Sequence, residues 1–174
     1  MPKRYSPRDL AYAGLFGASA LLLPVLFHLI HLGHLFMPMY LPLLALAFLV
    51  RPVPAAVTAA ITPLLSAAVT GMPPFYPPVA PLMAVELAAM AGLIAPLCVR
   101  WPRVNEWLLL AGALTLGRGI FVGLTYGFSL AVGLPAGFLA GVSFFAAWPG
   151  MILILITVPP IVRIARRSRR QPND

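Results

Sequence analysis

Residues 41–50 read LPLLALAFLV and contain no charged side chain, and a similar apolar run, MILILI, occupies residues 151–156. A transmembrane β-barrel would alternate apolar and polar residues, so these unbroken runs predict helices. Over the whole chain, 61% of residues are hydrophobic and only 9% are charged, against about 25% charged residues in a soluble domain. So few charges cannot cover the surface of a soluble protein, and disordered chains are poor in apolar residues. The composition therefore predicts an all-α integral membrane protein.

Six apolar segments are candidates for membrane-spanning helices. A span needs about 20 residues, so a chain of 174 residues has room for about six. The candidates lie at residues 9–28, 36–50, 53–70, 80–99, 107–127 and 142–163. The second and third are short and are separated only by Arg51 and Pro52, so one broken hairpin is the alternative there. The apolar, glycine-rich segment 128–141 is expected to be a loop, half-buried or re-entrant, and residues 1–174 form one membrane domain.

The basic residues indicate the orientation of these spans. All but one of the Lys and Arg residues flank the first or sixth span or lie in the second–third and fourth–fifth connections: Lys3, Arg4, Arg8, Arg51, Arg100, Arg103, Arg163, Arg166, Arg167, Arg169 and Arg170. With six spans all of these fall on one side of the membrane, and the positive-inside rule places both termini in the cytoplasm. The basic tail 164–174 is expected to contact anionic lipids rather than nucleic acid.

Two charged residues lie inside predicted spans, Glu86 in the fourth and Arg118 in the fifth. A charge at the centre of a bilayer costs about 2.5–3.5 kcal/mol on insertion scales and usually faces the protein interior or a water-filled cavity. One interpretation is an ion pair that only holds two helices together. The other is contact with a polar ligand, with Arg118 suited to a carboxylate, and a ligand could also intrude on a resting pair.

The connection after the third span is rich in proline. Residues 70–78 read TGMPPFYPP, and proline restricts φ and has no amide hydrogen to donate. The segment is therefore expected to be a stiff, non-helical loop that displays Met72, Phe75 and Tyr76 on the external side. These side chains either cap the apolar part of a ligand or anchor the loop in the membrane interface.

Three histidines recur at every third position, His28, His31 and His34. At 100° per residue they spread over about 120° of a helix surface, whereas metal ligands must converge on one point. No metal site is predicted. These histidines are more suited to the membrane interface, or one of them to a hydrogen bond with a ligand.

The first span carries small residues on two nearly opposite faces. At helical spacing, one face holds Ala11, Gly14 and Ala18, and the other holds Ala13, Gly17 and Ala20. Small residues let helices approach closely. Either one face packs inside this chain and the other against a partner chain, or the packing is entirely internal.

Motifs for catalysis are missing from the sequence. It contains no Walker loop, no nucleophile elbow and no HExxH motif. The single cysteine, Cys98, excludes an internal disulfide. We therefore predict that the chain is not an enzyme and that uphill transport would need an ion gradient or a partner.

Taken together, these segments resemble the substrate-binding S component of energy-coupling factor (ECF) vitamin transporters. The resemblance covers about residues 10–92. It rests on FMPMYLPLL at 36–44, TPLLS at 62–66, TGMPP at 70–74 and Glu86 in the next helix.

The resemblance implies a multi-pass subunit of a prokaryotic cell membrane that captures a water-soluble vitamin or precursor in an outward-opening pocket, without a cofactor. It implies three partner subunits, a membrane T component and two cytoplasmic ATPases. The residues it places near the ligand are Met72, Phe75, Tyr76, Glu86 and His34, to which the charge argument adds Arg118. The docking residues it implies are Gly14 and Ala18, or Ala13 and Gly17. The alternatives are a stand-alone proton-coupled carrier or channel with Glu86 as the proton site, and a membrane-embedded enzyme that uses the histidines.

Overall fold

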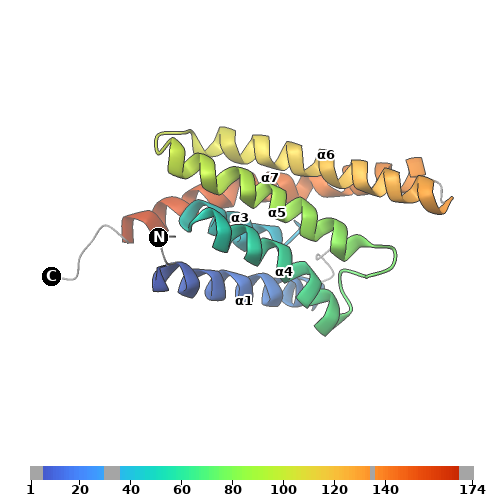
Figure 1. Cartoon of the computed structure of the whole chain (residues 1–174), viewed down its shortest axis with the longest axis horizontal. Helices are drawn as coiled ribbons and strands as arrows, with labels where there is room; N and C mark the ends of the chain where they lie inside the picture. Colours follow the sequence, from blue (N-terminus) through green and yellow to red (C-terminus); the bar gives the residue numbers. More distant parts are fainter. Residues whose placement is uncertain (1–5, 30–35, 134–135, 169–174) are drawn as a thin grey trace, which may run out of the picture.

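The computed structural model describes the backbone of residues 6–29, 36–133 and 136–168, and their side chains except at 28, 136–147 and 168. Within these ranges the structure is all-helical, with helices α1 (Pro7–Leu29), α3 (Tyr40–Leu49), α4 (Pro52–Thr70), α5 (Val79–Arg100), α6 (Glu106–Val132) and α7 (Ala136–Ser168). The helices lie side by side, and each runs opposite to the one before it (Figure 1). Five of them contain segments long and apolar enough to cross a membrane.

Helix α3 is the short exception, and it forms the centre of the core. It has 10 residues, which corresponds to about 15 Å of rise, half the thickness of a bilayer's hydrocarbon region. All of its residues except Leu41 are buried, and it contacts α1, α4, α5 and α7. The apolar run at 41–50, which composition alone would assign to a lipid-facing span, therefore packs against protein.

Prolines set both ends of α3. Pro38 precedes the helix, and Met37 adopts a positive φ of 48° and accepts a hydrogen bond from the Tyr40 amide at 3.0 Å. At the other end Arg51 is extended and Pro52 begins α4, as expected because proline disfavours a helical residue before it and suits the first helical position. The segments on either side of Arg51 and Pro52 are thus two separate helices, and the first of them is shorter than the predicted 36–50.

The predicted loop at 128–141 is wrong. Helix α6 continues to Val132 and α7 begins at Ala136, so most of that segment is helical. Gly133 ends α6 in the left-handed region, with φ of 74°. An apolar segment without water must satisfy its own backbone groups, and a helix does so despite several glycines. Prolines are also tolerated inside helices, at Pro24, Pro63, Pro96, Pro149, Pro159 and Pro160.

The proline-rich connection between α4 and α5 is non-helical, as predicted. It contains two cis peptide bonds, Met72–Pro73 and Tyr76–Pro77. The hydroxyl of Ser66 donates to the Met72 carbonyl at 2.7 Å, which ties the connection to the last turns of α4. The end of the bundle that carries this connection is called the loop end below.

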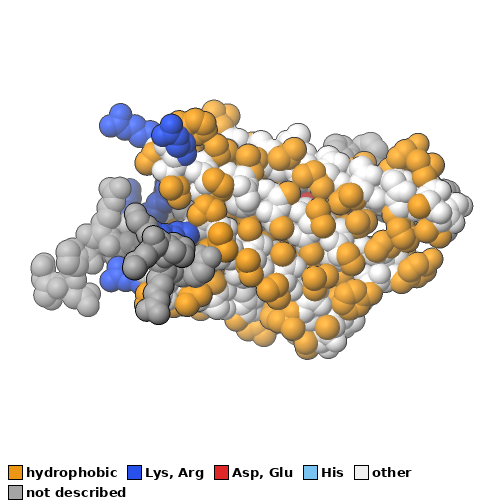
Figure 2. All heavy atoms as spheres, viewed as in Figure 1, with side chains coloured by type: hydrophobic (Ala, Val, Ile, Leu, Met, Phe, Trp, Pro, Cys, Tyr) orange, Lys and Arg blue, Asp and Glu red, His pale blue; other side chains and the backbone are white. Residues whose placement is uncertain are grey.

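The described arginines other than Arg118 gather at the opposite end, which we call the arginine-rich end. Figure 2 shows Lys and Arg side chains at this end only and hydrophobic side chains along the rest of the visible face. Helix α1 begins here and α7 ends here (Figure 1). The described basic residues of this end are Arg8, Arg51, Arg100, Arg103, Arg163, Arg166 and Arg167. The antiparallel order of the helices therefore brings the flanking charges together, as the span count predicted.

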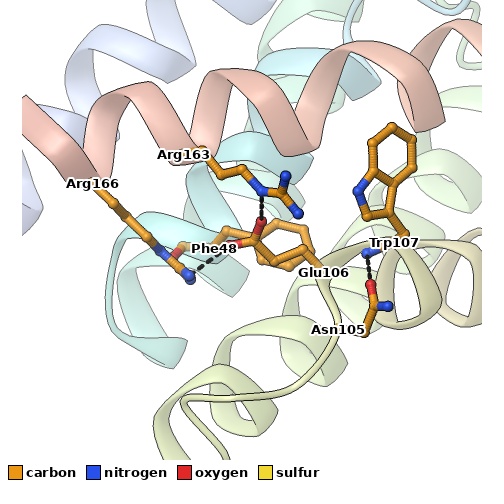
Figure 3. A network of polar contacts seen from close by, with 6 residues as sticks. All are labelled: Phe48, Asn105, Glu106, Trp107, Arg163 and Arg166. Carbon is orange, nitrogen blue, oxygen red and sulfur yellow. Dashed lines mark hydrogen bonds and ion pairs between the residues drawn. The ribbon is translucent and has the colours of Figure 1, made fainter.

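A polar network joins three helices at the arginine-rich end (Figure 3). Glu106, in the first turn of α6, accepts from Arg163 Nε at 3.1 Å and from Arg166 Nη1 at 2.6 Å. Arg166 Nη2 also donates to the Phe48 carbonyl at 3.1 Å, near the C-terminus of α3. The negative charge of Glu106 at the N-terminus of α6 and the positive charge of Arg166 near the C-terminus of α7 each interact favourably with the dipole of their own helix. The network therefore connects α3, α6 and α7 at this end.

Candidate functional site

Glu86 and Arg118 form a buried, two-contact ion pair between α5 and α6. Arg118 Nε lies 2.8 Å from Glu86 Oε1, and Arg118 Nη2 lies 2.7 Å from Oε2. The residues are 0% and 5% exposed, respectively. An unpaired charge at this depth would be very costly, and the paired geometry avoids that cost. The structure therefore contains the ion pair between Glu86 and Arg118, the first of the two interpretations of these charges.

Tyr40, the first residue of α3, completes a three-residue cluster. Its hydroxyl donates to Glu86 Oε2 and accepts from Arg118 Nη2 at 2.9 Å. Tyr40 is 1% exposed. Sequence reasoning did not assign Tyr40 to the site. The signal that could have found it is its hydroxyl, the one side-chain polar group within 36–50, because a buried tyrosine hydroxyl usually finds a partner.

An aromatic ring covers the guanidinium. Arg118 Cζ lies 4.9 Å from the ring centroid of Phe121, one turn further along α6, and 5.5 Å from that of Tyr40. A desolvated cation over an aromatic face gains about 2 kcal/mol or more. The cluster carries no net charge, and its carboxylate oxygens are both occupied. Glu86 occupies the Nε and Nη2 edge of the guanidinium, so a ligand carboxylate would pair with that edge only by replacing Glu86.

Close contact between α5 and α6 sets the geometry of the pair. A Cβ atom at Gly117 would lie 1.9 Å from Met90 Cε and 2.8 Å from Met90 Cγ. Met90 is one turn after Glu86 on α5, and Gly117 directly precedes Arg118 on α6. The absence of a side chain at Gly117 therefore lets the two charged residues come within hydrogen-bonding distance.

We expect Gly117→Ala to destabilise the protein by about 1–3 kcal/mol, the usual cost of overpacking a filled site. Gly119→Ala is the matched control on the same helix, since a Cβ atom at Gly119 would have no neighbour within 4 Å among the described residues. The control should be neutral or slightly stabilising, because alanine favours helices over glycine by up to about 1 kcal/mol. Unfolding midpoints of both purified variants check this, and equal midpoints would contradict the close-contact argument.

The predicted loop residues lie at the loop end and are exposed rather than gathered around the ion pair. Met72, Phe75 and Tyr76 are exposed, and the Tyr76 ring packs edge-on against Phe128 of α6, with centroids 6.5 Å apart. Glu86 lies about two turns below the start of α5, or about 10 Å along its axis. The loop therefore lies about 10 Å nearer the loop end than the cluster of Tyr40, Glu86 and Arg118.

Between the loop and the ion pair lies one polar group that has no hydrogen-bond partner among the described residues. The Thr125 hydroxyl is buried and unbonded within the described part of the chain. Thr125 follows Arg118 by seven residues, so both share one face of α6. A buried hydroxyl without a partner is unusual in a folded protein. It marks a point between the loop and the cluster where a ligand could be hydrogen-bonded.

The structure gives no contact for the three histidines and no candidate metal site among the described residues. His31, His34 and the side chain of His28 lie outside the described residues. Within 6–29, 36–133 and 136–168, the structure holds no group of three His, Cys, Asp or Glu side chains that could bind a metal.

The two small-residue faces of α1 have different surroundings. On one face a Cβ at Gly17 would lie 3.3 Å from Thr58 Cγ2 of α4, Ala20 is completely buried, and Ala13 packs against the core. On the other face Ala11, Gly14 and Ala18 are exposed, and no described atom lies within 4 Å of a Cβ at Gly14. The first face is therefore internal and the second faces outward.

Comparison with protein-family models, with curated proteins and with solved structures finds no match for this chain.

Proposed function

We propose that this protein is the substrate-capturing S component of an ECF-type transporter in a prokaryotic cell membrane. It has six membrane helices, including the short α3, and both termini are cytoplasmic. It binds a water-soluble vitamin or vitamin precursor from outside. A membrane T component and two cytoplasmic ATPases then drive uptake.

The observation that carries this proposal is the packing of α1. Of its described residues only Ala20 is buried, and within the described part of the chain the helix packs on α3 and α4 alone. Its outward face combines Ala11, Gly14 and Ala18 with exposed leucines such as Leu15 and Leu22. Small residues on a lipid-facing helix allow a second membrane helix to approach closely. Gly14 and Ala18, rather than Ala13 and Gly17, are therefore the docking residues.

The loop end supports the binding half of the proposal. The stiff α4–α5 connection presents Met72, Phe75 and Tyr76, and the Thr125 hydroxyl, which has no partner among the described residues, lies between it and Arg118. A ligand with an apolar part and one carboxylate suits this order of groups, with the apolar part beneath the loop. His34 is proposed to border the same site.

Ligand binding is tested by thermal unfolding of the detergent-purified protein with water-soluble vitamins and their precursors. A ligand present at 100 times its dissociation constant should stabilise the protein by about 2.7 kcal/mol. Phe75→Ala should weaken the response, and Leu108→Ala, exposed on α6 near the arginine-rich end, should not. If no compound in the panel raises the unfolding midpoint, the capture role is refuted.

A stand-alone proton-coupled carrier is the second candidate, because Glu86 is a fully buried carboxyl group inside a span. Such residues often serve as proton sites in transporters. The two candidates differ in their energy source. Uptake of the identified ligand that stops without the ATPases supports the S component. Uptake that persists without ATPases and collapses with the proton gradient would support the carrier.

A further inference from the structure

A pocket at the arginine-rich end is separate from the candidate site. Its volume is about 380 Å³, and it is partly open to the surroundings. It lies where the start of α1, the α3–α4 junction, the last turns of α5 and the end of α7 meet. Its polar lining is Ser6, Asp9, Arg51 and Arg166.

The polar lining contains two charges of opposite sign that are not used within the described structure. Arg166 is occupied by Glu106 and by the Phe48 carbonyl. In contrast, no ion pair within 6–29, 36–133 and 136–168 involves Asp9 or Arg51. Both residues are exposed or partly exposed at this end. The pocket thus offers one carboxylate, that of Asp9, and one guanidinium, that of Arg51, neither of which has an ion-pair partner among the described residues.

The remaining lining is apolar. Leu49 and Val50 of the α3 C-terminus form one part, and Ala95 and Val99 of α5 form another. Val99 is 65% exposed on the outside of the bundle. Because the helices on either side are lipid-facing by composition, this end lies at the boundary between hydrocarbon and headgroups. Both polar and apolar surfaces are therefore presented at headgroup depth.

We propose that this pocket binds the headgroup of a zwitterionic aminophospholipid, such as phosphatidylethanolamine. Arg51 binds the phosphate, Asp9 accepts from the primary ammonium, and the apolar lining contacts the glycerol and the first methylene groups. A phosphoglycerol headgroup uses Arg51 but brings only neutral hydroxyl groups to Asp9, so it lacks the stronger, charge-assisted hydrogen bond that an ammonium donates. A choline headgroup has no N–H to donate to Asp9. The pair of free charges therefore selects phosphoethanolamine over phosphoglycerol and phosphocholine. This inference does not depend on the proposed function.

The lone cysteine of the chain provides a probe inside the pocket. Cys98 lines it and is partly buried, and it is the only cysteine in the sequence. The rate of its modification by a thiol-specific methanethiosulfonate reagent can be followed in the full-length, delipidated protein in detergent. Phosphatidylethanolamine should slow the reaction more than the same molar amount of phosphatidylglycerol or phosphatidylcholine. Native mass spectrometry, which counts retained lipids, gives a second readout that does not depend on thiol reactivity.

Three variants locate the effect. Asp9→Asn should abolish the preference for phosphatidylethanolamine over phosphatidylglycerol, and Arg51→Gln should weaken the binding of both lipids about two- to fivefold, the size of one partly exposed ion pair. Arg103→Gln is the matched control, since Arg103 is exposed at the same end but does not line the pocket. It should leave the preference unchanged.

Three results would overturn the proposal. Equal protection by phosphatidylglycerol and phosphatidylethanolamine in the wild type, or an unchanged preference in Asp9→Asn, would indicate only general attraction to the arginine-rich end. Equal protection by free phosphoethanolamine would indicate a soluble ligand rather than a lipid. Absence of both lipid retention and Cys98 protection would show that no headgroup binds.

Discussion

Replacing Arg118 with leucine should lower the free energy of unfolding by about 3–5 kcal/mol, the usual cost of removing one partner from a buried ion pair. The Glu86 carboxylate would remain in a site that is 0% exposed, with only the Tyr40 hydroxyl among the described residues to stabilise it. Glu86→Leu should have an effect of similar size, because it leaves the guanidinium without a counter-charge. Denaturation of the purified variants in detergent, followed by loss of helical signal, measures both.

A double variant separates the pair from its individual charges. Glu86→Met combined with Arg118→Met removes both charges and keeps unbranched side chains in the core. Its stability should be closer to wild type than that of either single leucine variant, since apolar replacement of a whole buried pair is often neutral or stabilising. Tyr40→Phe removes only the hydroxyl and should cost about 1–3 kcal/mol. If the free energy of unfolding of the single leucine variants were within about 1 kcal/mol of that of the wild type, Glu86 and Arg118 would not form a buried ion pair.

The second large effect is expected on α1. Under the proposed function, Gly14→Leu should reduce assembly with the T component and ATP-driven uptake at least about tenfold, which corresponds to about 1.4 kcal/mol of lost association free energy. The leucine would project from the outward face, where no described atom of this chain lies within 4 Å. The folded subunit should therefore keep its unfolding midpoint and its ligand affinity.

Gly17→Leu is the matched comparison, three residues further along the same helix. There the added side chain meets Thr58 of α4 at a Cβ distance of 3.3 Å, so this variant should lose stability by about 1–3 kcal/mol. Co-purification with the other transporter subunits and uptake in vesicles distinguish the two variants. If Gly14→Leu assembles and transports normally, the outward face of α1 is not the docking surface.

Local signals predicted three helices within a few residues of their positions. Pro52 and Gly71 bracket α4, and the proline-rich connection and Arg100 bracket α5, because each of these residues has a conformational or solvation preference that acts on its own segment. The predicted first span, 9–28, lies within α1, which runs from Pro7 to Leu29. Where the preference was ambiguous, as for the glycines of 128–141, the prediction of a loop was wrong.

The sequence by itself determined the all-helical, membrane-like class, and it identified Glu86 and Arg118 as the two charged residues inside predicted spans. Both results follow from the composition of short segments, because a membrane interior requires helical backbone and makes an exposed charge costly. It left both faces of α1 equivalent and treated LPLLALAFLV as another span. Only the tertiary structure decided that α3 is enclosed by other helices, that Tyr40 joins Glu86 and Arg118, and that Gly14 faces outward while Gly17 packs on α4. The physical reason is that apolar residues suit lipid and protein interior alike, so hydrophobicity cannot reveal which neighbour covers a helix.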